Sequence, residues 1–179
     1  MNVNAMEEIE RIERIMGKLS NTQKILLSTD GSVTTILDVL KGTVTIRTLK
    51  QEFEPCSHEI ASKLSINPGD TVNHRVVVIG NREPLIHAVS YIPLSRLDDE
   101  FREDLIRADI PIGRILKKHR IESRREIEVI DVENPAPHLV KIFGTDSPML
   151  TRTYNIIHDD EVLIRIKETF PFEWFREEF

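Results

Sequence analysis

Residues 72–92 read VNHRVVVIGNREPLIHAVSYI, and this stretch decides the fold. It contains two apolar runs, 72–79 and 85–92, that are rich in valine and isoleucine. Between them lies GNRE at 80–83, a segment of residues typical of turns. Two β-forming runs on either side of such a segment predict an antiparallel hairpin. An antiparallel sheet is therefore the expected centre of the fold.

A second hairpin is expected near the end of the chain. Its strands are predicted at 150–157 and 162–170, with the turn HDDE at 158–161. Turn signals and apolar periodicity predict strands also at 43–53 and 125–132, and helices at 6–19, 21–27, 32–40, 56–64, 97–107, 111–119 and 138–143. Connections of this kind favour an α+β fold with a mostly antiparallel sheet and helices on one side, rather than a doubly wound parallel sheet.

The first predicted helix carries an apolar stripe. Its members are expected to be Ile9, Ile12, Ile15 and Met16. The segment is charged along its length, unlike a secretory signal. The chain has 179 residues, 40% of them hydrophobic, which suits one packed core. We therefore expect residues 1–179 to form a single domain in which 1–20 contribute an N-terminal helix.

Composition limits the classes of protein to which the chain can belong. No apolar run approaches the roughly 18 residues that a membrane span needs. Cys56 is the one cysteine of the sequence, so neither a disulfide framework nor a thiolate metal cluster is expected, and the expected location is the cytoplasm. The formal net charge of −6 argues against nucleic acid as a partner.

One basic cluster stands out against this acidic background. It consists of KKHR at 117–120, followed by Arg124 and Arg125. The first interpretation is a solvated helix end and turn. The alternative is an electropositive approach to an anionic small molecule.

Glu168 is a charged residue among apolar strand neighbours. Because side chains alternate along a strand, Glu168 is expected to share the core face with Val162, Ile164, Ile166 and Phe170. The other face, expected to meet solvent, carries Leu163, Arg165, Lys167 and Thr169. A buried carboxylate is costly unless it is paired, neutralised or placed in a polar cavity. Glu168 is thus either part of a structural ion pair or a pocket carboxylate with a raised pKa, suited to general acid catalysis.

Arg75 poses the same question in the first hairpin, because both faces of its strand are apolar. A guanidinium in that position is the natural partner of a carboxylate, either from the protein or from a ligand. Arg152 is a third case, and its alternative interpretation is an arginine that reaches past the sheet edge to water. Two inward arginines and one inward glutamate together indicate a cavity for an anionic ligand.

Other familiar signatures are missing from the sequence. It has no phosphate-binding glycine loop, no G-x-S-x-G elbow and no H-E-x-x-H pair. The six histidines lack metal-ligand spacing. We therefore expect neither a metal ion nor an organic cofactor.

Six short segments together resemble the chorismate pyruvate-lyase family, in its archaeal and actinobacterial lyase-like branch. They are the hairpin segments RVVVI at 75–79, EPL at 83–85 and SYIPL at 90–94, then PIGR at 111–114, KETFP at 167–171, and SVT at 32–34. The resemblance covers most of the chain after about residue 25. It implies a chorismate lyase-like fold, in which helical flaps cover a buried ligand pocket.

The activity that the resemblance implies is conversion of chorismate to 4-hydroxybenzoate and pyruvate without a cofactor. By the same resemblance Arg75 would bind the ring carboxylate and Glu168 would meet the hydroxyl and ether end of the ring. Ile112 and Gly113 would line the flap side, and Val33 the opposite wall. We add one expectation of our own, that Arg152 assists with the enolpyruvyl carboxylate.

The chain departs from the family pattern in the second strand of the first hairpin. Many bacterial lyases have an arginine there, whereas this chain has Val89 and Ser90. The same fold also serves as the effector-binding (UTRA) domain of transcription regulators, so a non-catalytic module that binds an aromatic carboxylate is the alternative function. The sequence is compatible with a monomer or a small homo-oligomer.

Overall fold

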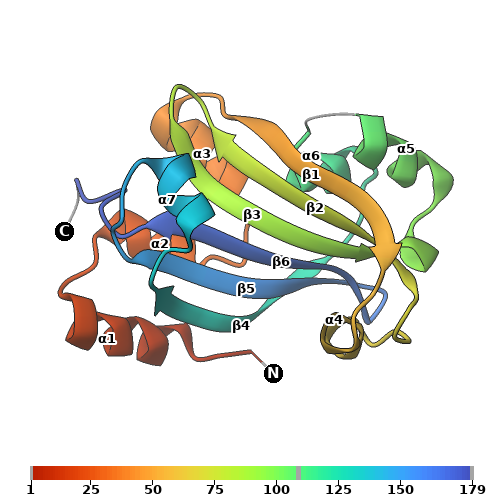
Figure 1. The fold of residues 1–179 in the computed structure, drawn as a ribbon, viewed down its shortest axis with the longest axis horizontal. Helices are drawn as coiled ribbons and strands as arrows, with labels where there is room; N and C mark the ends of the chain where they lie inside the picture. The colour runs from red at the N-terminus through yellow and green to blue at the C-terminus, as the bar shows by residue number, and fades with distance from the viewer. Residues whose placement is uncertain (1, 108–109, 178–179) are drawn as a thin grey trace.

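The structure, a computed structural model, describes residues 2–107 and 110–177. Its centre is a six-stranded sheet in the order β1-β2-β3-β6-β5-β4, in which every neighbouring pair is antiparallel. The mostly antiparallel sheet expected from the two hairpins is therefore confirmed. The strands are β1 (Thr45–Pro55), β2 (Thr71–Gly80), β3 (Pro84–Pro93), β4 (Arg124–Glu133), β5 (Met149–His158) and β6 (Glu161–Pro171) (Figure 1).

The described residues also form seven α-helices, each within a few residues of its expected range. They are α1 (Ala5–Met16), α2 (Asn21–Ser28), α3 (Val33–Lys41), α4 (His58–Leu64), α5 (Asp99–Arg107), α6 (Ile112–Lys118) and α7 (Pro137–Phe143), with a 3₁₀ turn at Leu94–Arg96. Side-chain caps fix several starts: Ser20 forms a capping box with Gln23, and Ser32 accepts from the amide of Thr35. No helix in these two ranges is both long and apolar enough to cross a membrane.

The two hairpin turns have local causes. Gly80 ends β2 at a close backbone approach, where a Cβ would lie 2.2 Å from the carbonyl oxygen of Glu83. In the second turn Asp159 and Asp160 adopt φ values of 50° and 59°. A two-residue loop with both central residues at positive φ matches the right-handed twist of the strands that it joins. Both hairpins that set the sheet topology are therefore specified locally.

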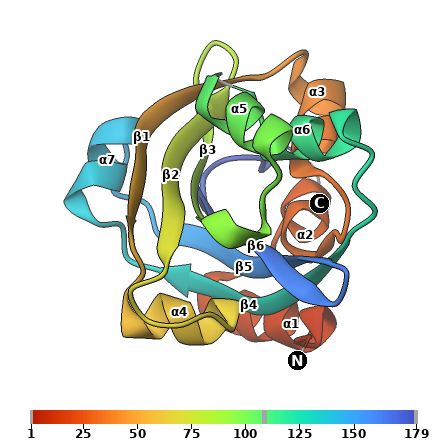
Figure 2. The same cartoon turned by 90° about the vertical axis from the view of Figure 1, so that its right-hand side faces the viewer.

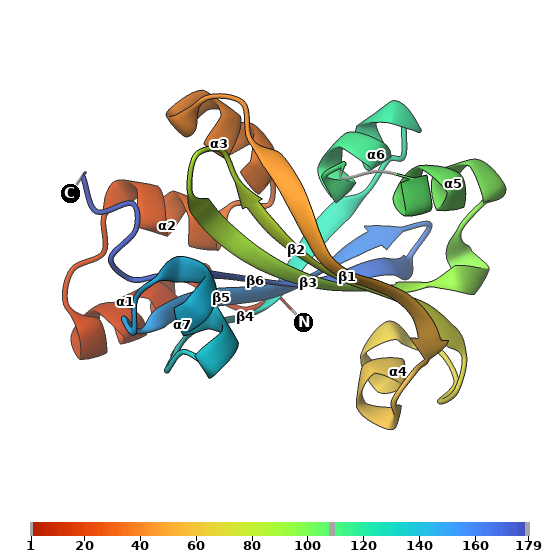
Figure 3. The ribbon, with the colours of Figure 1, turned by 45° about the horizontal axis from the view of Figure 1, so that its top comes forward.

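Helices cover both faces of the sheet, so the expectation of helices on one side is wrong. Figure 3 shows α4 and α7 on the side opposite α3, α5 and α6. Leu64 of α4 packs with Val72 and Tyr91, and His138 of α7 contacts His87 of β3. Periodicity predicts an apolar face for each helix but not which face of a sheet it will cover.

Two further expectations about faces are wrong. Ile15 is 63% exposed, while Ile9 and Ile12 are buried, because the apolar stripe of a 3.6-residue helix does not reach position 15. On β6 the pairing with β5 skips Leu163, which is an irregularity of the β-bulge type. Leu163 consequently joins the main core, and Val162 packs with the small cluster around α4.

The sheet is strongly curved and wraps around the main core. Figure 2 shows α2, α3, α5 and α6 closing the open side of this curve. The core on that face combines residues of the helices with residues of the strands, such as Phe101, Leu37, Ile86 and Ile164. A curved sheet closed by helices can leave an enclosed space between them, and here it does.

Candidate active site

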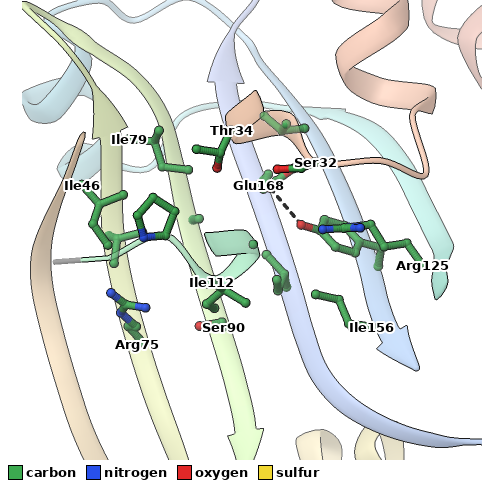
Figure 4. Close-up of a pocket in the computed structure, with 17 residues that line it drawn as sticks. Ser32, Thr34, Ile46, Arg75, Ile79, Ser90, Ile112, Arg125, Ile156 and Glu168 are labelled. Atoms are coloured by element: carbon green, nitrogen blue, oxygen red, sulfur yellow. Dashed lines mark hydrogen bonds between the residues drawn. The ribbon is translucent and has the colours of Figure 1, made fainter. Parts of the chain in front are cut away.

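A pocket lies on the concave face of the sheet, beneath the first turns of α3 and α6 (Figure 4). The space between its walls, open mouth included, is about 510 Å³. Five of the six site residues expected from the sequence line it, and only Arg152 does not. The lining residues are Ser32, Val33, Thr34, Ile46, Arg75, Val77, Ile79, Ala88, Ser90, Pro111, Ile112, Gly113, Arg125, Tyr154, Ile156, Ile166 and Glu168.

Glu168 is the acidic group of the pocket and is only 6% exposed. Its register partner on β5 is Arg152, whose Nε donates to Oε2 at 2.7 Å. The Tyr154 hydroxyl donates to the other carboxylate oxygen, Oε1, at 2.9 Å. Glu168 is therefore part of an ion pair, and it also lines the pocket.

Arg152 is buried behind Glu168, with 1% exposure, so the interpretation that it reaches water is wrong. Its Nη1 donates to the carbonyl of Thr29 at 2.6 Å, and its guanidinium lies 4.6 Å from the ring centre of Tyr154. Burial acts to lower the pKa of Arg152, but the charges of Glu168 and Tyr154 and the hydrogen bonds to them together raise it. Arg152 is thus fixed as a cation that holds the Glu168 carboxylate in place.

Tyr154 is the second donor to Glu168. Burial raises the pKa of its hydroxyl, and the nearby Glu168 charge raises it further. Tyr154 therefore stays protonated at neutral pH and donates its hydrogen bond permanently. Glu168 is held from two directions by groups on one strand, which leaves little freedom for its carboxylate.

Arg75 stands at the other side of the pocket and is 1% exposed. Its Nη2 donates to the carbonyl of Ile110 at 3.0 Å, which ties β2 to the segment that leads into α6. Its register partner on β3 is Ser90, which also lines the pocket. Figure 4 shows Arg75 and Glu168 on opposite sides of the space, with Ile112 between them.

The two helical walls meet above the ligand space. A Cβ on Gly113 would lie 3.1 Å from the hydroxyl oxygen of Ser32, so glycine allows α6 to approach the start of α3 closely. Arg114 then bonds both carboxylate oxygens of Asp38, at 3.1 and 2.9 Å. Burial alone would raise the pKa of Asp38, but the Val44 amide and Arg114 lower it overall. This ion pair joins the wall that carries Val33 to the wall that carries Ile112.

Among the polar residues of the lining, sequence reasoning did not single out Tyr154 or Arg125. Tyr154 shares its strand face with Arg152 and Ile156, so alternation along β5 could have placed it. Arg125 was grouped with a basic cluster interpreted first as solvated. Its strand turns it toward the pocket, whereas its neighbour Arg124 points away and is 57% exposed. The alternative interpretation, an electropositive approach, describes Arg125 better.

The charged residues of the lining, within 2–107 and 110–177, are Arg75, Arg125 and Glu168. Arg152 already balances Glu168, and the other two charged residues of the lining are arginines. Such a lining suits an anionic ligand. Among the same residues no group of three or more His, Cys, Asp or Glu side chains is placed to hold a metal ion.

The sequence of the chain matches both a family model and a protein of known sequence. The family model described as "Chorismate pyruvate-lyase Rv2949c-like" matches residues 27–176. Over 172 residues the chain is 37% identical to "Putative lyase MJ0807" of Methanocaldococcus jannaschii, covering 92% of this chain and 85% of that protein.

Solved structures show the same fold at low identity. The effector domain of PhnF from Mycobacterium smegmatis has a TM-score of 0.68 at 16% identity, covering 79% of this chain and 88% of that one. The C-terminal domain of the histidine utilization repressor from Pseudomonas syringae has a TM-score of 0.63 at 13% identity, with 76% and 95% covered. A GntR-family regulator from Bacillus cereus gives 0.60 at 14% identity, with 76% and 96% covered. The α+β fold is therefore that of the effector domains of transcription regulators.

Proposed function

The chain belongs to the Rv2949c-like chorismate pyruvate-lyase family, and from this premise we propose that it converts chorismate to 4-hydroxybenzoate and pyruvate. The observation that carries the proposal is the convergence of Arg75, Glu168, Val33, Ile112 and Gly113 on one enclosed pocket. An arginine and a carboxylate on opposite walls suit a flat ring with a carboxylate at one end and an oxygen at the other.

In the proposed reaction, bonds break and form within the substrate and not between the substrate and the protein. The ether bond between the ring and the enolpyruvyl group breaks, a ring C–H proton leaves, and the ring becomes aromatic. The departing enolpyruvate gains a proton and becomes pyruvate. Since aromatisation drives the reaction, the protein needs to orient the substrate, exclude water and move a proton.

Each residue then has a role in this proposal. Arg75 binds the ring carboxylate and fixes the direction of the ring. Glu168 stands at the hydroxyl and ether end and is the acid–base group. Tyr154 and Arg152 position Glu168 through the bonds described above, so the role expected for Arg152 shifts from binding substrate to holding the catalytic carboxylate. We also propose that residues 1–179 act as one domain.

The first experiment is incubation of purified protein with chorismate while 4-hydroxybenzoate and pyruvate are followed. Both products are expected in equal amounts, well above the spontaneous rate. Tight binding of 4-hydroxybenzoate without turnover would instead favour a non-catalytic binding domain of the UTRA type. Neither turnover nor binding would rule out both functions.

Replacing Glu168 tests the mechanism. Glu168→Gln and Glu168→Ala are expected to lower kcat by about 10²–10⁴-fold, because positioned acid–base groups contribute about this much. Glu161→Gln, an exposed carboxylate at the start of the same strand, serves as the matched control and should leave kcat unchanged. Normal turnover by the Ala variant would show that the mechanism is wrong.

A further inference from the structure

Arg125 is the one charged residue of the described pocket lining to which the proposed function assigns no role. It lies on β4, which is at the edge of the sheet farthest from β1, and it lines the pocket together with Tyr154 and Glu168. Figure 4 shows its side chain on the Glu168 side of the space, across from Arg75. The charge of Arg125 acts to lower the pKa of Tyr154, its neighbour in the pocket lining.

The guanidinium of Arg125 has hydrogen-bonding capacity to spare. Its Nε is buried and has no hydrogen-bond partner among the residues that the structure describes. Its Nη1 makes one long bond, 3.4 Å, to the carbonyl of Asp30. Buried N–H groups of an arginine are normally satisfied, and a ligand that accepts bonds is one way to satisfy them. The side chain as a whole is half-buried, so it stands toward the mouth of the pocket.

Charge balance points to the kind of group that Arg125 meets. Arg152 already neutralises Glu168 at 2.7 Å, and the arginines Arg75 and Arg125 stand on opposite sides of the ligand space. Chorismate carries two carboxylates, one on the ring and one on the enolpyruvyl group. The enolpyruvyl group leaves from the ether end of the ring, which in the proposed binding mode lies beside Glu168.

From these observations we infer that Arg125 is the substrate-binding residue for the enolpyruvyl carboxylate. The inference rests on the proposed function and deepens it. Arg125 takes the part first expected of Arg152, whose guanidinium is held by Glu168 and by the Thr29 carbonyl. It also supplies from β4 a cation that this chain lacks at Val89 and Ser90 of β3. The site therefore selects a dicarboxylate, and the aromatic product, which has one carboxylate, keeps only the contact with Arg75.

The test compares two adjacent arginines. Arg125→Gln removes the charge that faces the pocket, and Arg124→Gln removes one that points to solvent and pairs with Glu126 and Asp160. Arg125→Gln is expected to raise the KM for chorismate by about tenfold or more, because an arginine–carboxylate hydrogen bond is charge-assisted. Its Kd for 4-hydroxybenzoate, measured by calorimetry, should equal that of the wild type. Arg124→Gln should change neither quantity.

Two results would overturn the inference while leaving the lyase function in place. One is an unchanged KM in Arg125→Gln, and the other is an equal loss of affinity for chorismate and 4-hydroxybenzoate. If the wild type makes no product, the Kd of chorismate is measured in place of the KM. Weaker chorismate binding by Arg125→Gln, with 4-hydroxybenzoate unaffected, then supports the second carboxylate site although turnover has failed. No chorismate binding by the wild type overturns the inference together with the proposed function.

Discussion

The carboxylate of Glu168 and the guanidinium of Arg152 form the most deeply buried ion pair among the described residues, with side-chain exposures of 7% and 1%. Bringing two charges out of water costs several kcal/mol each, and their attraction repays this only when the geometry is good. A 2.7 Å contact, with Tyr154 satisfying the second oxygen, meets that condition. The pair thus links the stability of the fold to the position of the proposed catalytic group.

Removing one partner of this pair should therefore be costly. Arg152→Met leaves Glu168 buried without its cation, and we expect the free energy of unfolding to fall by about 3–5 kcal/mol. The double variant Arg152→Met/Glu168→Leu should recover most of this loss, because no uncompensated charge remains. Urea denaturation of the wild type, the single variant and the double variant measures both effects.

Arg165→Met gives the matched control, because Arg165 pairs with Glu128 at 2.6 Å on the more exposed face of the same sheet. Its loss should cost clearly less than the loss of Arg152. A double variant as unstable as Arg152→Met would contradict the explanation, since the cost would then lie in lost packing and not in the unpaired carboxylate.

Strand alternation was enough to identify Arg75 and Glu168 as charges set among apolar residues. It could not tell which charges meet, because that depends on the register of β5 and β6, which the irregularity at Leu163 shifts by one residue. Arg152 meets Glu168 because these two residues are opposite each other in the β5–β6 register. Arg125 shows the same limit: it belongs to a basic run in the sequence, and only the path of β4 turns it toward the pocket while Arg124 faces solvent.

At the scale of elements, the ranges of the strands and helices were predictable because their boundaries are local. Ser20, Ser32 and Gly80 act through contacts with residues a few positions away. The placement of helices over the sheet is not local. The helices α4 and α7 each have an apolar face that could pack on either face of the sheet. Contacts with Tyr91 and His87 hold them on the face opposite α3, α5 and α6.

The contact between α7 and β3 carries a pH dependence. His87 is buried beneath α7, and burial, together with the nearby His138 and Lys167, lowers its pKa from 6.5 to about 4. Between these two values the unfolded chain binds a proton at this site and the folded chain does not. The free energy of unfolding is therefore not reduced by His87 above pH 6.5. It falls as the pH drops from 6.5 toward 4, because the unfolded chain then binds the proton more readily. The loss should amount to at most about 3 kcal/mol.

This prediction is checked by urea denaturation of the wild type and of His87→Leu at several pH values between neutral and pH 4. The Leu variant should show a flatter dependence of unfolding free energy on pH, because the titrating group is gone. His58→Gln, which alters an exposed histidine on α4, should behave like the wild type. Equal slopes in the wild type and His87→Leu would place the acid sensitivity elsewhere in the molecule.

At the scale of the whole molecule, the architecture is shared by lyases and by effector domains, so the fold alone does not select one function. In this chain the walls of the pocket come from many elements. Here β1 to β6, α3 and α6 all contribute lining residues, and the Arg114–Asp38 pair joins the two helical walls. The pocket therefore lies among residues of all six strands.

Ligand binding should for this reason stabilise the molecule as one unit. With 4-hydroxybenzoate at about 100 times its Kd, the gain is about 2.7 kcal/mol. For a chain of this size that corresponds to a rise in Tm of about 5–10 °C. Scanning calorimetry should show a single transition that moves as a whole, in the wild type and in Arg125→Gln alike. Arg75→Gln, which lacks the cation for the ring carboxylate, should show little or no shift. Two transitions, of which only one responds to the ligand, would contradict the proposal that residues 1–179 form a single domain.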